Sequence, residues 1–434
     1  MKRTRRAFAI VGLVLLIGAV ILAAAGIWLV RRPWPKVNGE IKVSGLSAPV
    51  EVIRDEWGVP HIYAENEHDL FFAQGYVHAQ DRLWQMEFNR RIGSGTLSAI
   101  LGESTLSIDR FMRTLGLRRA AERDLASAGE EMRSLLSAYA EGVNAYIESH
   151  RDRLPLEFTI LGAEPEPWTP VDTLNWAAVM SLQLGRKYPM ELFGAQLVAT
   201  LGDEAAQQLL PPYPEDTPII IPPEARSYAW LQGIDVSTDD ALAAVLGEPN
   251  MFLGSNNWVV HGSRTATGMP LLADDTHLGL EMPSIWYENG LHGGRFDSVG
   301  YSFPGAPLVI IGHNDRIAWG VTNLGPDVQD LYIERFDDPA HPTQYLHKGQ
   351  WQDLETIYET IEVKGQAPVT LNVLITHHGP IVNQVVGDLA FAEPLALQWT
   401  ALEGNRIFHS VMLLNLATNW EEFRQALSYW DAPT

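Results

Sequence analysis

The sequence predicts an α+β fold in which a mostly helical first half precedes a strand-rich second half. Between residues 67 and 202, apolar residues recur at spacings of three, four and seven, which is typical of amphipathic helices. After residue 254, short runs of β-branched and aromatic residues are separated by Gly and Asn-Asp turns, as in strands. Because helices and strands follow one another in blocks along the chain, we expect a layered α+β architecture.

Composition and charge exclude several classes of protein. The chain has 434 residues, 46% of them hydrophobic and 14 of them Trp, so it can bury a large core and is not disordered throughout. Its formal net charge of −22 would repel nucleic-acid phosphates, so we expect no nucleic-acid partner. The absence of Cys excludes disulfides, Cys-ligated zinc, iron–sulfur clusters and a thiol nucleophile, and it suits an exported protein.

Residues 1–32 form a separate N-terminal segment. Basic residues precede an uncharged stretch from Phe8 to Val30, which is long enough for a helix to cross a bilayer core of ~30 Å. This segment is either an uncleaved signal anchor or a signal peptide cleaved near residues 23–26. Its length exceeds that of a usual signal peptide and favours the anchor. Either alternative places the remaining chain outside the cytoplasm, anchored to the membrane or free in the periplasm or medium.

The first half of the chain after this segment is expected to be mainly helical. Residues 33–36 (PWPK) are predicted to be a linker, because proline cannot continue a helix. In chain order, the pattern then predicts short strands within 39–53, a helix from Glu67 or Asp69 to 93–95, and one or two helices within 115–150. A Pro-rich stretch at 154–170 ends this helical run, and further helices are predicted at 171–184 and 189–202.

A change in composition and in hydrophobic pattern separates the two halves of the chain. Six prolines lie within residues 211–223, and the chain then stays acidic and weakly patterned up to Gly254. This stretch is either an ordinary linker or a spacer that is removed. The second half is predicted to contain strands at 255–261, 269–273, 308–312, 317–321 and 328–335, further strands within 359–392 around a turn at 377–380, and helix at 405–430.

Familiar catalytic motifs are missing from the sequence. It contains no Gly-x-Ser-x-Gly elbow, Walker loop, dinucleotide glycine pattern or His-Glu-x-x-His, and we expect no organic cofactor. His61 and His68 are seven residues apart, and His377 and His378 are adjacent. Neither spacing is typical of a zinc site, so all four are interpreted as structural or solvent-facing. Ser255 follows Gly254 at the start of the first predicted strand of the second half, although alone this dipeptide indicates only a turn.

The stretch around Ser255 resembles the start of the catalytic chain in penicillin acylases, which are N-terminal nucleophile hydrolases. Further motifs in the same order support this resemblance over roughly residues 45–434. They are residues 52–62 (VIRDEWGVPHI), 75–87 (GYVHAQDRLWQME), 92–95 (IGSG), 154–158 (LPLEF), 165–168 (PEPW), 304–305 (PG), 312–314 (GHN) and 318–323 (AWGVTN).

The resemblance implies a precursor that is cut into two chains. It implies a four-layer αββα fold, with residues 33–224 as the small chain, 225–254 as the spacer and 255–434 as the beginning of the large chain. Cleavage of the Gly254–Ser255 bond would make Ser255 a chain terminus, and the two chains would stay together as a heterodimer. The α-amine of Ser255 would then activate its own hydroxyl, since an α-amine has a pKa of ~7.7–8.0 and is partly neutral near pH 7.

The resemblance also assigns residues that assist Ser255. The backbone N–H of Asn323 corresponds to one donor of the oxyanion hole, and His277 to a residue that supports the nucleophile. The second oxyanion donor of the family is an Asn side chain that would lie beyond Thr434. The family's large chain is longer than residues 255–434, so we interpret this sequence as shortened at its carboxyl end.

A calcium site is implied at residues 327–330. Carboxylate and carbonyl oxygens are the ligands that Ca²⁺ prefers, and Asp327, Gln329 and Asp330 supply them within one short loop. In the family, a Glu of the small chain completes the site, and Glu191 matches it best.

The expected function is hydrolysis of a linear N-acyl amide. The acyl group could be a penicillin or cephalosporin side chain, the acyl chain of an acyl-homoserine lactone, or that of another N-acyl amine. Alternatives are a membrane-anchored, inactive or binding homologue that has kept the fold, and an inactive fragment.

Overall fold

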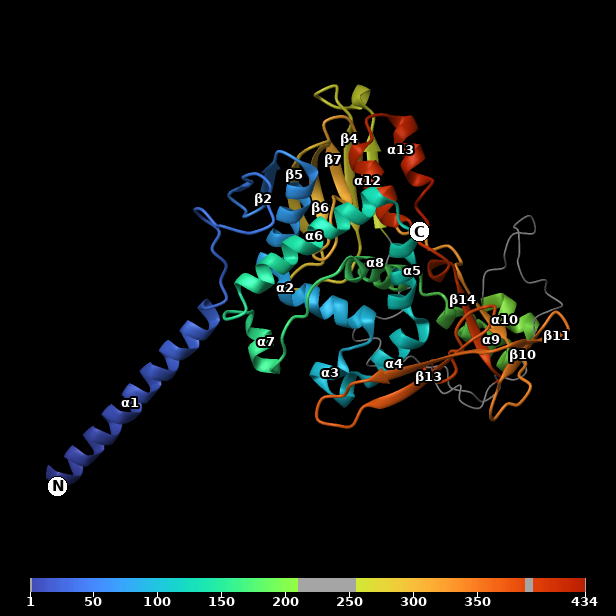
Figure 1. Ribbon diagram of the computed structural model, residues 1–434, viewed down its shortest axis with the longest axis horizontal. Helices are drawn as coiled ribbons and strands as arrows, with labels where there is room; N and C mark the ends of the chain where they lie inside the picture. The colour runs from blue at the N-terminus through green and yellow to red at the C-terminus, as the bar shows by residue number, and fades with distance from the viewer. Residues whose placement is uncertain (1, 210–254, 387–392, 434) are drawn as a thin grey trace.

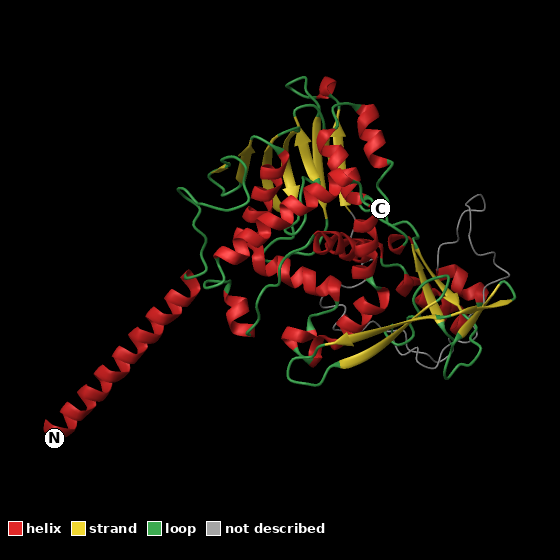
Figure 2. Cartoon of the chain, in the orientation of Figure 1, coloured by secondary structure: helices red, strands yellow, loops and turns green. Residues whose placement is uncertain are grey.

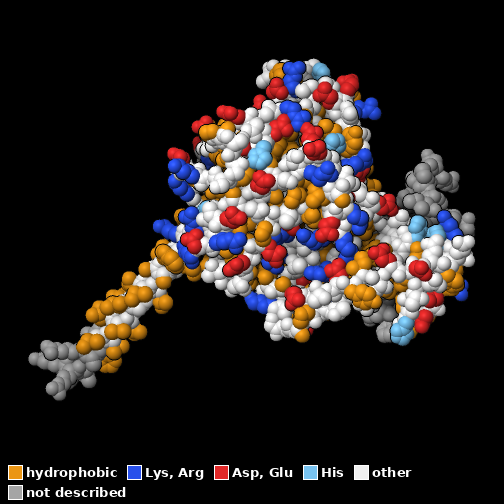
Figure 3. Space-filling view, in the orientation of Figure 1, with side chains coloured by type: hydrophobic (Ala, Val, Ile, Leu, Met, Phe, Trp, Pro, Cys, Tyr) orange, Lys and Arg blue, Asp and Glu red, His pale blue; other side chains and the backbone are white. Residues whose placement is uncertain are grey.

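The computed structural model describes residues 2–209, 255–386 and 393–433 (Figure 1). The predicted spacer at 225–254, including Gly254, lies outside the described residues. The first helix, α1 (Lys2–Arg31), projects away from the body of the protein. Its stretch Ile10–Arg31 is long and apolar enough to cross a membrane, and its apolar side chains are exposed (Figure 3). It could therefore serve as a signal sequence or an anchor.

The helical part confirms most of the predicted helices. Helix α2 (Glu67–Ser94) begins at Asn66, whose side chain accepts the N–H of Asp69, and ends at Gly95 in the left-handed conformation. The helices after α2 are α3 (Ser98–Leu101), α4 (Leu106–Leu115), α5 (Leu117–Ser127), α6 (Glu130–Ser149), α7 (Leu156–Leu161), α8 (Pro170–Gly185), α9 (Tyr188–Leu201) and α10 (Asp203–Leu209). Helix α6 ends before the Pro-rich stretch 154–170, as predicted, although that stretch itself contains one short helix, α7.

Helices α2 and α6 approach each other very closely because glycines lie at their contact. A Cβ atom on Gly75 would lie 2.1 Å from the carbonyl oxygen of Tyr139, and one on Gly142 would lie 1.8 Å from that of Phe72. No side chain larger than hydrogen fits at these two positions without moving the backbones apart. Helix α2 of this pair packs against β2 (Pro60–Ala64) and β5 (Tyr287–Gly293) of the main sheet.

The main sheet combines strands from both halves of the chain. Its order is β1-β2-β5-β6-β7-β8, and all neighbours are antiparallel except β2 and β5. Within the stretch 39–53, the structure has only β1, because residues 39–50 find no strand partner. The bounds are β1 (Glu51–Arg54), β2 (Pro60–Ala64), β5 (Tyr287–Gly293), β6 (Phe296–Ser302), β7 (Ile311–Asn314) and β8 (Ala318–Trp319).

Helices cover one face of this sheet (Figure 2). Along β6, every second side chain is buried: Phe296 packs edge-on against Phe71 of α2, and Ser298 donates to Asn415 of α12 (Ile407–Leu416). Asp297 and Tyr301, which alternate with them, are exposed. The described residues thus form a mixed helix-and-sheet unit with helices on one side, and the four-layer αββα arrangement stays a prediction.

The remaining strands form short pairs, and two helices end the described chain. Strand β3 pairs with β4, β9 with β14, β10 with β11 and β12 with β13. The β12–β13 ribbon is tied to α4 and α5 by ion pairs of Arg113 and Arg119 with Glu359. The bounds are β3 (Ser255–Val260), β4 (Leu271–Thr276), β9 (Gln329–Ile333), β10 (Gln344–His347), β11 (Gln350–Asp353), β12 (Glu355–Ile361), β13 (Val369–Ile375), β14 (Leu395–Trp399), α12 (Ile407–Leu416) and α13 (Trp420–Leu427).

Candidate active site

Ser255 is the first residue of β3, as the sequence predicts. The strand pairs antiparallel with β4, which places Ser255 opposite Thr276. Ser255 is half-buried and lines a cavity of about 350 Å³. At this strand end, the residue is held by the backbone ladder on one side and borders the cavity on the other. Its position suits attack on a bound molecule.

The cavity beside Ser255 is lined almost entirely by apolar side chains. Trp286 stacks on Phe303 with ring centroids 4.4 Å apart, and Trp176 meets the same Phe303 edge-on. The indole N–H of Trp286 donates to the hydroxyl of Thr276, which fixes this wall to β4. The remaining wall consists of Met180 and Leu184 of α8, Val411 of α12, Phe423 of α13, and Trp430, which follows α13. An apolar group of moderate size fits such a space.

Asn323 lines the same cavity as Ser255. Its side-chain amide donates to the carbonyl of Leu184 at 2.9 Å, so the segment after β8 is anchored to the end of α8. This anchoring leaves the backbone at Asn323 beside the cavity, where the resemblance predicts an oxyanion donor.

The segment before Asn323 lies directly against β3 and β4. A Cβ atom on Gly320 would be 2.8 Å from the Asp274 carboxylate and 2.9 Å from the Asn257 amide, so a larger residue there would have to displace these two side chains. Asn257 donates to Asp274 at 3.0 Å across the strand pair. Burial, opposed by a hydrogen bond from the Val321 backbone, raises the pKa of Asp274. These contacts fix the distance between the Ser255 strand and the Asn323 segment.

His277 lies next to the Ser255 strand rather than in the cavity wall. Its Nε2 atom is 3.3 Å from Nδ2 of Asn256 and 3.1 Å from Oδ2 of Asp275. Among the described residues that line the cavity, the neighbours Thr276 and Leu278 are present and His277 is not. The structure therefore places His277 where it can orient Asn256, and its support of the nucleophile stays a prediction.

The predicted calcium ligands gather where α9 meets β9. Glu191 of α9 accepts the backbone N–H of Leu331 at 3.0 Å. Burial and the nearby charge of Asp327 raise the pKa of Asp330. Burial, together with the charges of Asp330 and Glu191, raises the pKa of Tyr332. Asp327 is exposed, whereas Asp330 and Glu191 are half-buried, and the charges of Asp327 and Asp330 repel each other. This group of carboxylates fits Ca²⁺, because a cation would relieve the repulsion.

The side chain of Gln329 has a different role from a metal ligand in this arrangement. It is 2% exposed, and its Oε1 accepts the backbone N–H groups of Lys187 and Tyr188. This side chain therefore joins β9 to the beginning of α9. A contribution of Gln329 to calcium binding would have to come from its backbone carbonyl and stays a prediction.

The histidines interpreted as structural fall into two groups. His61 stacks on His292, and His68 contacts Asp69 and Glu141, so both have protein partners. His377 and His378 instead meet His347, which lies about 30 residues earlier at the end of β10. The sequence analysis did not single out His347, because no local spacing connects it to the pair.

Sequence reasoning also missed the aromatic wall of the cavity. Trp176, Trp286, Phe303 and Trp430 come from widely separated parts of the chain, so no pattern in the sequence could group them.

Comparison with known proteins identifies the family to which these features belong. A sequence model of the family described as penicillin amidase matches residues 49–434, which is most of the chain. The chain belongs to the penicillin amidase family. This result confirms the resemblance seen in the sequence motifs.

Relatives within the penicillin amidase family carry two kinds of name. The acyl-homoserine lactone acylase QuiP of Pseudomonas aeruginosa is 35% identical over 391 residues, covering 87% of this chain and 46% of the relative. The penicillin acylase 2 proenzyme of Pseudomonas sp. (strain SE83) is 36% identical over 362 residues, covering 80% and 45%. The penicillin G acylase of Escherichia coli is 29% identical over 434 residues, covering 87% and 51%. The chain spans about half the length of these relatives.

Proposed function

We propose that this chain is part of an amidohydrolase that cuts itself before Ser255 and then hydrolyses linear N-acyl amides. One observation carries the proposal: in a member of the penicillin amidase family, Ser255 and Asn323 border one apolar cavity. The name of the relative from Pseudomonas sp., a proenzyme, supports processing of the precursor.

Self-cleavage supplies the catalytic base. The Ser255 Oγ attacks the carbonyl carbon of Gly254, the C–N bond breaks as the acyl group moves to oxygen, and water hydrolyses the resulting ester. The products are a carboxyl terminus on Gly254 and a free α-amine on Ser255. This amine has an ordinary pKa of ~7.7–8.0, so a useful fraction is neutral near pH 7 and can accept the proton of the hydroxyl.

The same hydroxyl then acts on the substrate. Ser255 Oγ attacks the amide carbonyl carbon while its proton passes to the α-amine. The negative oxygen of the tetrahedral intermediate is stabilised by the backbone N–H of Asn323. The amine product leaves with the proton from the Ser255 amine, and water hydrolyses the acyl-enzyme to release the acid. His277 keeps Asn256, and with it the start of β3, in position.

The cavity favours an apolar acyl group. Its Trp and Phe walls would contact a hydrocarbon or aryl chain whose carbonyl reaches Ser255. An anionic acyl group would lose its hydration there with no cation to pair with among the described lining residues. Penicillin-type aryl acyl groups and the acyl chains of acyl-homoserine lactones both meet this requirement, and relatives are named for each.

The wider organisation is proposed on the same basis. The small and large chains would remain a heterodimer, because β2 of the first half and β5 of the second are paired in one sheet. A second sheet on the exposed face of β6 would complete the αββα layers. Helix α1 would export the protein and hold it at the outer face of the membrane.

A substrate panel tests the proposal. The intact protein is incubated with a phenylacetyl, an octanoyl and a glutaryl amide of one fluorogenic amine, and amine release is measured. We expect kcat/KM to be at least tenfold higher for the two apolar acyl groups than for glutaryl. The Ser255→Ala variant should release no amine. Hydrolysis by this variant, or a preference for glutaryl, would contradict the proposal.

A further inference from the structure

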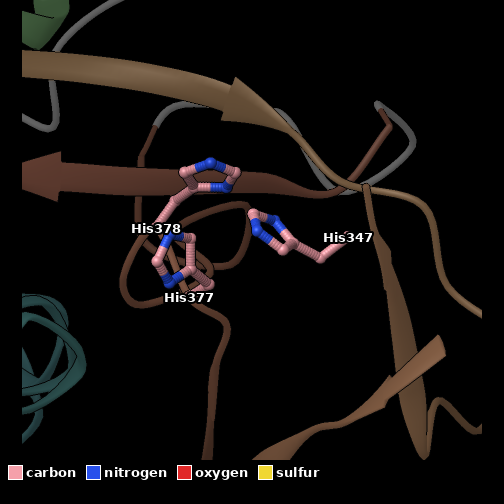
Figure 4. Close-up of side chains that lie close together, drawn as sticks. All are labelled: His347, His377 and His378. Carbon is pink, nitrogen blue, oxygen red and sulfur yellow. The ribbon is translucent and has the colours of Figure 1, made fainter. Parts of the chain in front are cut away.

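Three histidine rings lie together in the β-rich region away from the active site (Figure 4). His347 ends β10, and His377 and His378 lie in the turn that follows β13. Each ring offers a nitrogen atom, and these atoms all lie within 4.8 Å of one another. Two ligands of one tetrahedral zinc ion at ~2.0–2.1 Å are roughly 3.3 Å apart, so modest rotations of the side chains would close the site.

The surroundings hold these rings in place. The backbone N–H of His377 donates to the hydroxyl of Tyr345, a buried residue of β10. His378 stacks on Tyr332 with ring centroids 4.0 Å apart. Gly379 has a φ of +141°, and a Cβ there would lie 2.1 Å from the carbonyl oxygen of Leu397. The turn that presents both histidines is therefore fixed against β10, β9 and β14.

A buried carboxylate accompanies the cluster. Nδ1 of His378 lies 2.8 Å from Oε1 of Glu334, which is 5% exposed and also accepts the hydroxyl of Thr376. A carboxylate bonded to a histidine ring fixes the ring orientation and makes it a better metal ligand. A carboxylate beside the three rings would also balance part of the charge of a bound cation.

We propose that His347, His377 and His378 bind one first-row transition-metal ion of the zinc type, with Glu334 as the supporting carboxylate. Imidazole nitrogens are ligands for zinc, copper and nickel, whereas calcium and magnesium prefer oxygen. His377 is exposed and the other two rings are half-buried, so an ion can enter from solvent. The bound ion would join the β10–β11 hairpin to the turn after β13.

This cluster uses other side chains than the proposed calcium site, and it lies apart from Ser255. Figure 1 places β10 and β13 well away from β4, whose last residue lies opposite Ser255. The proposal therefore does not depend on amide hydrolysis, and its test needs no substrate.

Zinc binding to untagged protein tests the proposal. Zinc chloride is titrated into the intact protein at pH 7.5, with excess calcium present to fill any carboxylate site, and heat is measured by calorimetry. We expect one zinc ion per chain at the cluster. The His347→Ala and His378→Gln variants should each weaken zinc binding at least tenfold, and Glu334→Gln should weaken it about tenfold.

A matched control separates this site from ordinary surface histidines. His341 lies in the same region, and its side chain is 89% exposed. The His341→Ala variant should bind zinc as the unchanged protein does. His377→Ala removes an exposed ring, so it should weaken binding without disturbing the fold, and circular dichroism would verify this. Unchanged zinc affinity in the His347 and His377 variants, or no zinc binding by the unchanged protein, would overturn the proposal.

Discussion

His78 shows how strongly burial acts on a single side chain of this protein. The ring is fully buried between α2, α6 and the main sheet, with Nδ1 2.8 Å from the Tyr139 hydroxyl and Nε2 3.0 Å from the Ser302 hydroxyl. Burial, together with the nearby charge of Arg82, lowers the pKa of His78 to about 3. The ring is therefore neutral in the folded protein over the physiological pH range.

This pKa shift predicts a stability loss in mild acid. The unfolded chain binds a proton at His78 below its ordinary pKa of about 6.5, whereas the folded protein does not. Stability from His78 is thus complete above that pH and falls as the pH decreases toward 3. We expect the free energy of unfolding to fall between pH 7.5 and 5, and to fall less in His78→Gln. Urea unfolding at several pH values measures this, and His341→Gln should behave as the unchanged protein does. Equal slopes for both variants would contradict the assignment.

The carboxylates near Asp330 lead to a second prediction at the residue scale. If Ca²⁺ binds there, chelation should lower the melting temperature of the intact protein, because a ligand at 100 times its Kd stabilises the folded state by about 2.7 kcal/mol. Asp330→Asn should remove most of this calcium-dependent shift. Asp338→Asn, which changes a more exposed carboxylate nearby, should retain it. If the melting temperature of the unchanged protein is the same with and without calcium, the calcium site is contradicted.

The contact between α2 and α6 gives a prediction at the scale of elements. Gly142→Ala would place a methyl group 1.8 Å from the carbonyl oxygen of Phe72, so the helices must separate. We expect a loss of about 1–3 kcal/mol in the free energy of unfolding, as for other overpacked interiors. Gly129→Ala at the beginning of the same helix meets no atom within 4 Å and is the matched control. Equal stability of the two variants in chemical denaturation would show that the helices are not tightly packed.

The local sequence predicts the helices of this protein better than its strands. Helix α2 was predictable from end to end, because its apolar spacing and Gly95 both lie in the local sequence. Strands β5 and β6 were missed, since β5 contains glycines and polar residues such as Asn289. That side chain is buried because Gln74 of α2 donates to it and it donates to Gly300 of β6. Partners distant in sequence therefore made this segment a strand.

The candidate active site, like the fold, could be predicted from the sequence only in part. Ser255 and Asn323 came from a resemblance to a family, and the structure places both at one cavity. The aromatic wall and the meeting of His347 with His377 depend on how distant segments pack, which no spacing in the sequence encodes.

At the scale of the whole molecule, α1 predicts attachment to a membrane. The described part of the chain buries none of this apolar span, so removing the helix should leave the fold intact. The intact protein is expected in the membrane fraction of the producing cell, whereas a variant lacking residues 2–32 should be soluble. Fractionation with antibody detection measures this. Release of the unchanged protein by high salt alone would contradict insertion of the helix.

The central claim is that Ser255 becomes the first residue of a separate chain and catalyses from there. Terminal sequencing of the large fragment of the purified intact protein tests it most directly. The account predicts that the fragment begins Ser-Asn-Asn-Trp, that Ser255→Ala remains one uncut and inactive chain, and that Ser263→Ala is processed normally. Active enzyme with the Gly254–Ser255 bond intact would contradict the account.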